Sequence, residues 1–269
     1  MSQPAPHIVR RGSGAPLILV HGMGVDHRLL LPLDAALEAA GGWERIYVDL
    51  PGFGGTPALP APGGLPEMAD WLDDVVGELV GEARFALLGN SLGGLLVREV
   101  LARRGEQVAG LALIAPVVDP DPRERDVPER VVLEEDEALI AGLDEDDAEP
   151  FLEMAVVQTR PVWENFREHV LPGVRALDKD AVKRLEERYT LEGPLPEERF
   201  GTYERPTLIV TGRQDDKVGW KDQLALAEHF PRLTLAMLDR TGHNVHLDQE
   251  AAVGAMVQNW AADAARELD

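Results

Sequence analysis

The chain has 269 residues, a formal net charge of −22 and no cysteine. Its length suits one large domain, or one domain with an insertion, and can bury a sizeable core. The acidity argues against nucleic acid and anionic membrane surfaces as partners, because both bind basic faces. The lack of cysteine excludes disulfides, thiolate nucleophiles and cysteine-based metal sites.

We expect no secretory signal peptide at the start of the given sequence. The first residues, MSQPAPHIVRRGSG, lack the apolar stretch of a secretory signal. No apolar run approaches the roughly 20 residues needed to span a bilayer. We therefore expect a cytoplasmic protein with no membrane or nucleic-acid partner. The pattern leaves the oligomeric state open.

Strands and helices alternate from about residue 16 to residue 118. Helical spacing follows in 28–41, in 65–80 and after Ser91, and the amphipathic 65–80 segment groups Met68, Leu72, Val75, Val76 and Leu79 on one face. This alternation predicts an α/β fold with a mostly parallel central sheet and helices on both faces. The strands are expected at 17-LILV-20, 45-RIYVDL-50, 84-RFALLG-89 and 108-VAGLALIAPVV-118.

The alternation stops after residue 118 and resumes near residue 205. Between these points the pattern is helical, acidic and interrupted by prolines. We therefore expect a core domain of residues 1–118 and 205–269 with an inserted helical cap at 119–204. The resumed core is expected to consist of strands at 206–212 and 233–238 and helices at 220–230 and 248–267.

One serine stands in a G-x-S-x-G pattern between an expected strand and an expected helix. The stretch is 89-GNSLG-93, with Ser91 at its centre. This arrangement is typical of a nucleophile elbow, in which a sharp turn exposes the hydroxyl at the carboxyl edge of the sheet. The alternative is a tight turn that carries an inert serine.

A serine nucleophile requires a histidine base. His243 follows the last expected strand, so it should lie at the same edge of the sheet as Ser91. His246 is the second candidate, although its position favours packing or capping, and His21 is expected to hydrogen-bond its own turn. A zinc site built from His243 and His246 lacks a third ligand, so we expect no metal and no other cofactor.

The base in turn requires an orienting carboxylate. Asp215 and Asp216 both follow the 206–212 strand, and we favour Asp215. Asp119, after the 108–118 strand, is a further candidate, and Asp215 could also be a plain turn residue.

The oxyanion formed during acyl transfer needs two N–H donors. We expect them from Leu92, which follows the serine, and from Met23 in 21-HGMG-24. Gly22 allows close approach of a substrate and is expected to line its pocket, together with Arg160 and Trp163 of the cap. For Arg160 and Trp163 the alternative is packing of the cap onto the core.

These motifs together resemble the α/β-hydrolase superfamily. The resemblance spans HGMG (21–24), DLPGFG (49–54), GNSLGG (89–94), GRQDD (212–216) and TGHN (241–244), in the family's order. It implies the α/β-hydrolase fold and a serine hydrolase with a Ser91–His243–Asp215 triad under a cap. Only HIVRRG precedes the 17–20 strand, which suggests that the family's usual first strand is missing.

The expected activity is hydrolysis of small or medium carboxylic esters or lactones through an acyl-enzyme, with an uncharged or cationic acyl group. One alternative is a carbon–carbon hydrolase of ring-cleavage products, although such enzymes tend to carry tryptophan where this chain has Asn244. The other is a ligand-binding protein that has kept the fold without catalysis. Haloperoxidase chemistry would share the same triad as a side reaction.

Overall fold

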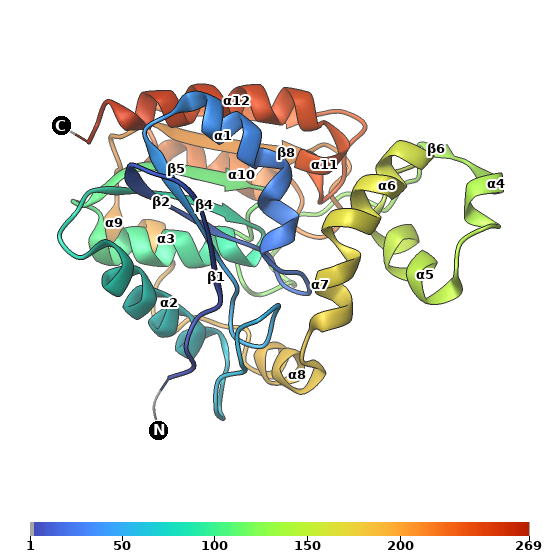
Figure 1. The fold of residues 1–269 in the computed structure, drawn as a ribbon, viewed down its shortest axis with the longest axis horizontal. Coiled ribbons are helices and arrows are strands. Elements are labelled where there is room, and N and C mark those ends of the chain that lie inside the picture. Colours follow the sequence, from blue (N-terminus) through green and yellow to red (C-terminus); the bar gives the residue numbers. More distant parts are fainter. Residues whose placement is uncertain (1–2, 269) are drawn as a thin grey trace.

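A seven-stranded sheet runs through the structure, a computed structural model that describes residues 3–268 (Figure 1). The strand order is β1-β3-β2-β4-β5-β8-β9. Every neighbouring pair is parallel except β1 with β3. The strands are β1 (Ile8–Gly12), β2 (Ala15–Val20), β3 (Trp43–Val48), β4 (Phe85–Asn90), β5 (Val108–Ile114), β8 (Thr207–Gly212) and β9 (Leu233–Leu238).

The first strand corrects the expectation that it would be missing. β1 pairs antiparallel with β3, from Ile8 opposite Val48 to Gly12 opposite Glu44. It lies at the sheet edge, and its last three residues, Arg10, Arg11 and Gly12, are exposed. Charged residues are common on edge strands, where they discourage pairing with other chains. A search for apolar runs therefore overlooks this strand.

The central strands form the core of the sheet because both of their faces are covered. All residues of β4 and β5 are buried, as is Leu17–Val20 of β2. Such strands read as continuous apolar runs rather than alternating ones. This is why the sequence pattern identified them correctly.

Helices cover both faces of the sheet (Figure 1). α1 (Asp34–Ala40) packs with α12 (Glu250–Ala265) on one face, and α2 (Leu65–Val80) packs with α3 (Leu92–Arg104) on the other. α2 has the predicted bounds, and four of its five predicted apolar residues are buried, while Leu79 is partly buried. The predicted helix at 28–41 is instead a 3-10 helix, His27–Leu33, followed by α1. Its Pro32 has no N–H to donate, which disfavours a continuous α-helix.

An insertion connects β5 to β8 and projects from one end of the sheet (Figure 1). Its apolar cluster includes Phe151, Trp163 and Phe166, and it also takes in Val25 from the loop after β2 and Leu29 from the 3-10 helix that follows. The two short strands in the insertion were not expected from its helical pattern. Its elements are β6 (Glu134–Glu135), α4 (Glu137–Ile140), α5 (Glu145–Met154), β7 (Val157–Gln158), α6 (Arg160–His169), α7 (Leu171–Ala176), α8 (Lys179–Glu187) and α9 (Pro196–Phe200).

Short helices complete the chain after β8. They are α10 (Lys221–Ala225), the 3-10 helix Leu226–His229, and α11 (Val245–Asp248), which leads into α12. Within residues 3–268, no helix combines the length and apolar character that crossing a membrane would require.

Candidate active site

Ser91 occupies a strained turn between β4 and α3. Its φ of 52° and ψ of −119° lie outside the regions that non-glycine residues favour. The turn is also crowded: a Cβ on Gly93 would lie 2.2 Å from the carbonyl oxygen of Val20, and one on Gly89 would lie 2.4 Å from that of Gly93. Any residue larger than glycine would therefore clash with the main chain at positions 89 and 93. This close packing allows β4 to turn directly into α3.

Ser91, His243 and Asp215 come together at the carboxyl edge of the sheet. The Nε2 of His243 lies 2.9 Å from the Ser91 hydroxyl oxygen, and its Nδ1 lies 2.9 Å from Oδ2 of Asp215. In the tautomer that satisfies both contacts, Nδ1–H donates to Asp215 and Nε2 accepts from Ser91. All three residues are buried, with Ser91 and His243 just 8% and 9% exposed.

Asp215 is also held by the main chain of its own turn. Its Oδ1 accepts from the N–H groups of Lys217 and Val218, at 2.9 and 3.0 Å. The alternative acids make other contacts: Asp216 lies 3.8 Å from the Lys217 ammonium, and Asp119 accepts from the N–H of Asp121. Among the three candidates, Asp215 is the carboxylate bonded to His243.

Asp248 lies behind the loop that carries His243, and the sequence analysis did not single it out. Its Oδ2 accepts from the N–H of Gly242 at 2.9 Å. Burial, with the negative charge of Asp215 nearby, raises the pKa of Asp248 to about 7. The sequence shows an acid five residues after His243, but acids are so frequent in this chain that this spacing does not distinguish Asp248 from the others.

The other candidate histidines are engaged elsewhere. His21 donates from Nδ1 to the carbonyl of Gly22 at 2.7 Å and accepts from the N–H of Leu50, so it fixes its turn as expected. His246 donates from Nε2 to the carbonyl of Leu29 at 2.9 Å. Burial lowers the pKa of His246 to about 4, so it is neutral at physiological pH.

Two main-chain N–H groups next to Ser91 have no acceptor among residues 3–268. They belong to Met23 and Leu92, the two predicted donors. Leu92 is the first residue of α3, where N–H groups lack intrahelical partners. Gly22 brings the Met23 loop close: a Cβ there would lie 2.8 Å from Oδ1 of Asn90 and 2.9 Å from Cβ of Ser91.

A cavity of about 680 Å³ opens over Ser91 and His243. Gly22 lines it as predicted, but Arg160 and Trp163 do not. Arg160 is exposed at the start of α6, and Trp163 is buried against Phe151 with ring centroids 5.1 Å apart. The sequence shows an aromatic residue but not whether it faces a pocket or a helix. Residues from the insertion that do line the cavity are Pro122, Arg125, Pro150, Glu153, Met154, Phe166, Val170, Val174, Leu177, Glu186 and Tyr189.

Residues 17–255 match the model of the alpha/beta hydrolase family. The chain belongs to this family. Its fold is the α/β-hydrolase fold, as the sequence motifs predicted.

Two comparisons place the chain within the α/β hydrolases. It is 29% identical to the pimeloyl-[acyl-carrier protein] methyl ester esterase of Shewanella woodyi, over 94% of this chain and 96% of that protein. A crystal structure of an alpha/beta superfamily hydrolase from Oenococcus oeni PSU-1 superposes with a TM-score of 0.87 and 27% identity, over 98% of this chain and 99% of that one.

A third relative carries a different name. The (E)-2-((N-methylformamido)methylene)succinate hydrolase of Acinetobacter baylyi is 23% identical, over 94% of this chain and 93% of that protein. Full-length similarity therefore extends to hydrolases that differ in their named substrates.

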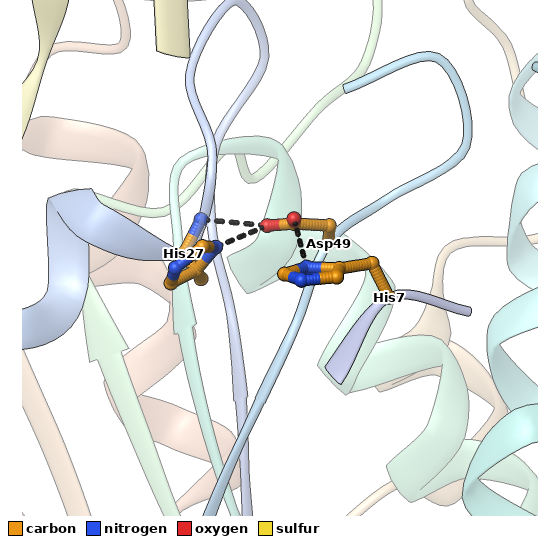
Figure 2. A group of neighbouring side chains, drawn as sticks. All are labelled: His7, His27 and Asp49. Carbon is orange, nitrogen blue, oxygen red and sulfur yellow. Dashed lines mark hydrogen bonds and ion pairs between the residues drawn. The ribbon is translucent and has the colours of Figure 1, made fainter. Parts of the chain in front are cut away.

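A second polar cluster of this α/β hydrolase joins His7, His27 and Asp49 (Figure 2). Two imidazoles and a carboxylate are a donor set that suits divalent transition metals. Each Asp49 oxygen already accepts one imidazole N–H, at 2.7 Å from His7 and 2.9 Å from His27. Each also accepts a main-chain N–H, from Gly55 and from His27. Both oxygens of the Asp49 carboxylate are therefore hydrogen-bonded twice as they stand, and the cluster ties the start of β1 to two other segments of the core.

Proposed function

We propose that this protein is a serine hydrolase that cleaves small or medium carboxylic esters through an acyl-enzyme. One observation carries the proposal: an unbroken chain of hydrogen bonds from Asp215 through His243 to Ser91, opening into a cavity. The esterase name of the Shewanella woodyi relative, which is similar over nearly its whole length, supports an ester as the substrate.

In the proposed mechanism, His243 takes the proton of Ser91 as the hydroxyl oxygen attacks the ester carbonyl carbon. Asp215 holds the imidazole in the tautomer that can accept this proton and stabilises the imidazolium that forms. Collapse of the tetrahedral intermediate expels the alcohol, which takes the proton back from His243. Water then attacks the acyl-enzyme by the same steps and releases the acid.

The N–H groups of Met23 and Leu92 are proposed to bind the tetrahedral oxyanion. Both are free of other acceptors among the described residues, and both belong to segments beside Ser91. Donors fixed before the reaction stabilise the developing charge without reorganising, and one such donor typically lowers the barrier by about 3 to 4 kcal/mol.

We propose further that residues 119–204 act as a cap that shapes the substrate pocket. The insertion contributes an apolar wall to the cavity, including Phe166, Val170 and Val174. An acyl chain would replace water against these side chains, and each buried methylene would contribute about 0.8 kcal/mol to binding. The wall therefore favours esters with an aliphatic acyl group.

The first test is labelling with a fluorophosphonate, followed by intact-mass analysis. We expect one adduct on the wild type and none on Ser91→Ala. Ser13→Ala is the matched control and should label like the wild type, because Ser2, Ser13 and Ser91 are the chain's serines. No adduct on folded wild-type protein would contradict the proposal.

Turnover separates the enzyme from the ligand-binding alternative. With methyl esters of aliphatic acids we expect steady product release, and an Asp215→Asn variant should lose about 10⁴-fold in kcat. Labelling without turnover on any ester or lactone would instead favour a ligand-binding protein. Cleavage of a vinylogous 1,5-diketone in preference to esters would favour the carbon–carbon hydrolase.

A further inference from the structure

One cation in the lining of the cavity lacks a carboxylate partner. The lining contains two cationic side chains, Lys217 and Arg125. The ammonium of Lys217 lies 2.9 Å from the Glu153 carboxylate and 3.8 Å from that of Asp216. Among residues 3–268, no carboxylate oxygen lies within 4.0 Å of the Arg125 guanidinium.

An arginine without a carboxylate partner is unusual in a chain with 48 acidic and 26 basic side chains. Two acids of the loop are engaged elsewhere: Asp121 pairs with Arg123, and Asp126 pairs with Lys221. Glu124, directly before Arg125, is exposed and forms no ion pair within residues 3–268. Asp119 accepts from a main-chain N–H. The loop therefore surrounds Arg125 with acids without neutralising it.

Main-chain carbonyl groups hold the Arg125 guanidinium in place. Its Nε donates to Asp119 at 3.0 Å, its Nη2 donates to Pro120 at 3.0 Å, and its Nη1 donates to Lys217 at 3.4 Å. Carbonyl groups orient the side chain but leave its full positive charge. The guanidinium has five N–H groups in a fixed fork, so donors remain for another acceptor.

A second donor lies beside it. The hydroxyl of Tyr189, on the segment after α8, adjoins Arg125, and Tyr189 also lines the cavity. Burial raises the pKa of Tyr189 to about 12, although the Arg125 guanidinium acts in the opposite direction. The phenol is therefore protonated near neutral pH and can donate to an anion.

We propose that Arg125, with Tyr189, binds an anionic group at the far end of the acyl chain. Resting on the proposed ester hydrolase function, this makes the preferred substrates monoesters of aliphatic dicarboxylic acids. The ester would sit at Ser91 and the free carboxylate at Arg125, because a guanidinium fork matches a carboxylate in two-point hydrogen bonding. The methylene chain would lie along the apolar wall formed by Val25, Leu29, Val170, Val174 and Leu177.

Two features of the charge distribution could favour a cationic acyl group instead. Glu186 also lines the cavity, but its side chain is exposed on α8, where water solvates the carboxylate. The net charge of −22 repels anions at long range, but physiological salt screens charges beyond about 8 Å. At contact distance, the partly buried guanidinium of Arg125 therefore influences the charge of the preferred acyl group more than Glu186 or the net charge does.

The test compares methyl esters matched in chain length. One series is the monomethyl esters of dicarboxylic acids with five to nine carbons, and the other is the methyl esters of the corresponding monocarboxylic acids. We expect the wild type to favour the half-esters at least 10-fold in kcat/KM at one chain length. Equal rates or a preference for the neutral esters would overturn the proposal.

Variants then assign the effect to the two side chains. Arg125→Gln should lower kcat/KM for the best half-ester 10- to 100-fold, mainly through KM, and change the neutral ester less than twofold. Tyr189→Phe, which removes only the hydroxyl, should lower the half-ester value about threefold to 10-fold. Arg167→Gln, at an exposed position of α6 outside the cavity lining, should have no effect. An equal loss on both esters would mean that Arg125 only supports the loop.

A binding measurement separates this inference from the proposed function. In the Ser91→Ala background, calorimetry should show the half-ester binding at least 10-fold more weakly when Arg125→Gln is added. If the wild type hydrolyses neither ester, the proposed function fails, yet this difference in binding would still support the anion site. Equal binding by both proteins would overturn it.

Discussion

Asp215 and Asp248 are two enclosed carboxylates that flank the His243 loop in different environments. Asp215 accepts from His243 and from two main-chain N–H groups, so three donors compensate its charge. Asp248 accepts from the N–H of Gly242 and has no other hydrogen-bond donor in the described part of the chain. Burial without compensation favours the neutral form, which explains the pKa of about 7 at Asp248.

This difference predicts a stabilising substitution. The pKa of Asp248 is about 7 in the folded protein, against about 3.9 for an unfolded aspartate, so unfolding releases the proton at intermediate pH. The group therefore costs stability progressively as pH rises from about 4 to about 7. Asp248→Asn should raise the free energy of unfolding above pH 7 by at most about 4 kcal/mol, and have no effect near pH 4.

Urea denaturation at several pH values measures this effect. Glu106→Gln is the control, because Glu106 is exposed and takes part in no ion pair within residues 3–268. An Asp248→Asn variant that is less stable than the wild type at pH 8 would show that the carboxylate charge itself holds the loop.

Sequence reasoning predicted the residues whose roles depend on local motifs. Ser91 lies in a turn that glycine spacing reveals, while Asp215 and His243 follow strands at the same edge of the sheet. Arg125 could not be found this way, because its environment is set by the directions in which acids one to six residues away point. The sequence shows those acids but not their partners.

At the level of elements, a buried arginine helps to tie the insertion to the core. The side chain of Arg98 on α3 is fully buried; it donates to Glu197 on α9 at 2.5 Å and to the carbonyl groups of Val117 and Val118 at 2.7 and 2.8 Å. One guanidinium thus joins α3, the chain leaving β5 and the last helix of the insertion.

Replacing one partner of this ion pair should lower the free energy of unfolding more than replacing both partners by apolar residues. Glu197→Gln leaves the Arg98 charge buried and is expected to lower the free energy of unfolding by about 3 to 5 kcal/mol. The double variant Arg98→Met/Glu197→Leu should be more stable than the sum of its single variants implies. Glu192→Gln, in an exposed pair with Arg188, should change stability by less than about 0.5 kcal/mol. Additivity of the two core substitutions, measured by urea unfolding, would refute the coupling.

The sequence predicted two kinds of element well: strands with both faces buried, and a helix with one buried apolar stripe. The apolar runs of β2, β4 and β5 and the stripe of α2 are direct consequences of burial. The exposed strand β1 and the packing of Trp163 depend on partners distant in the sequence. Periodicity along the chain carries no information about those partners.

For the whole molecule, the charge of −22 predicts a dependence of stability on salt. Nine of the 48 acidic side chains lie in residues 134–150, which are mostly exposed. Screening shortens the range of repulsion from about 30 Å at 0.01 M salt to about 8 Å at 0.15 M. The melting temperature should therefore rise over this interval, because the folded state holds like charges closer together than the unfolded chain does.

A variant with Asp144, Glu145, Asp146 and Glu149 changed to the corresponding amides should show a smaller rise in calorimetry. A melting temperature that falls with added salt would mean that favourable ion pairs, rather than repulsion, dominate the electrostatic energy.

The insertion leaves the sheet after β5 and returns at β8, and these two strands are hydrogen-bonded neighbours, with Leu111 opposite Thr207. Because the two strands are parallel, the chain leaves at the carboxyl end of β5 and re-enters at the amino end of β8, so the connection has to cross one face of the sheet. A segment joined in this way can be exchanged between relatives as a cassette, because its length does not alter the register of the sheet. Ser91, Asp215 and His243 all lie outside it. With the proposed role of the insertion as a cap, recombination in this segment would change the substrate range, provided that the incoming segment supplies an acid to meet Arg98.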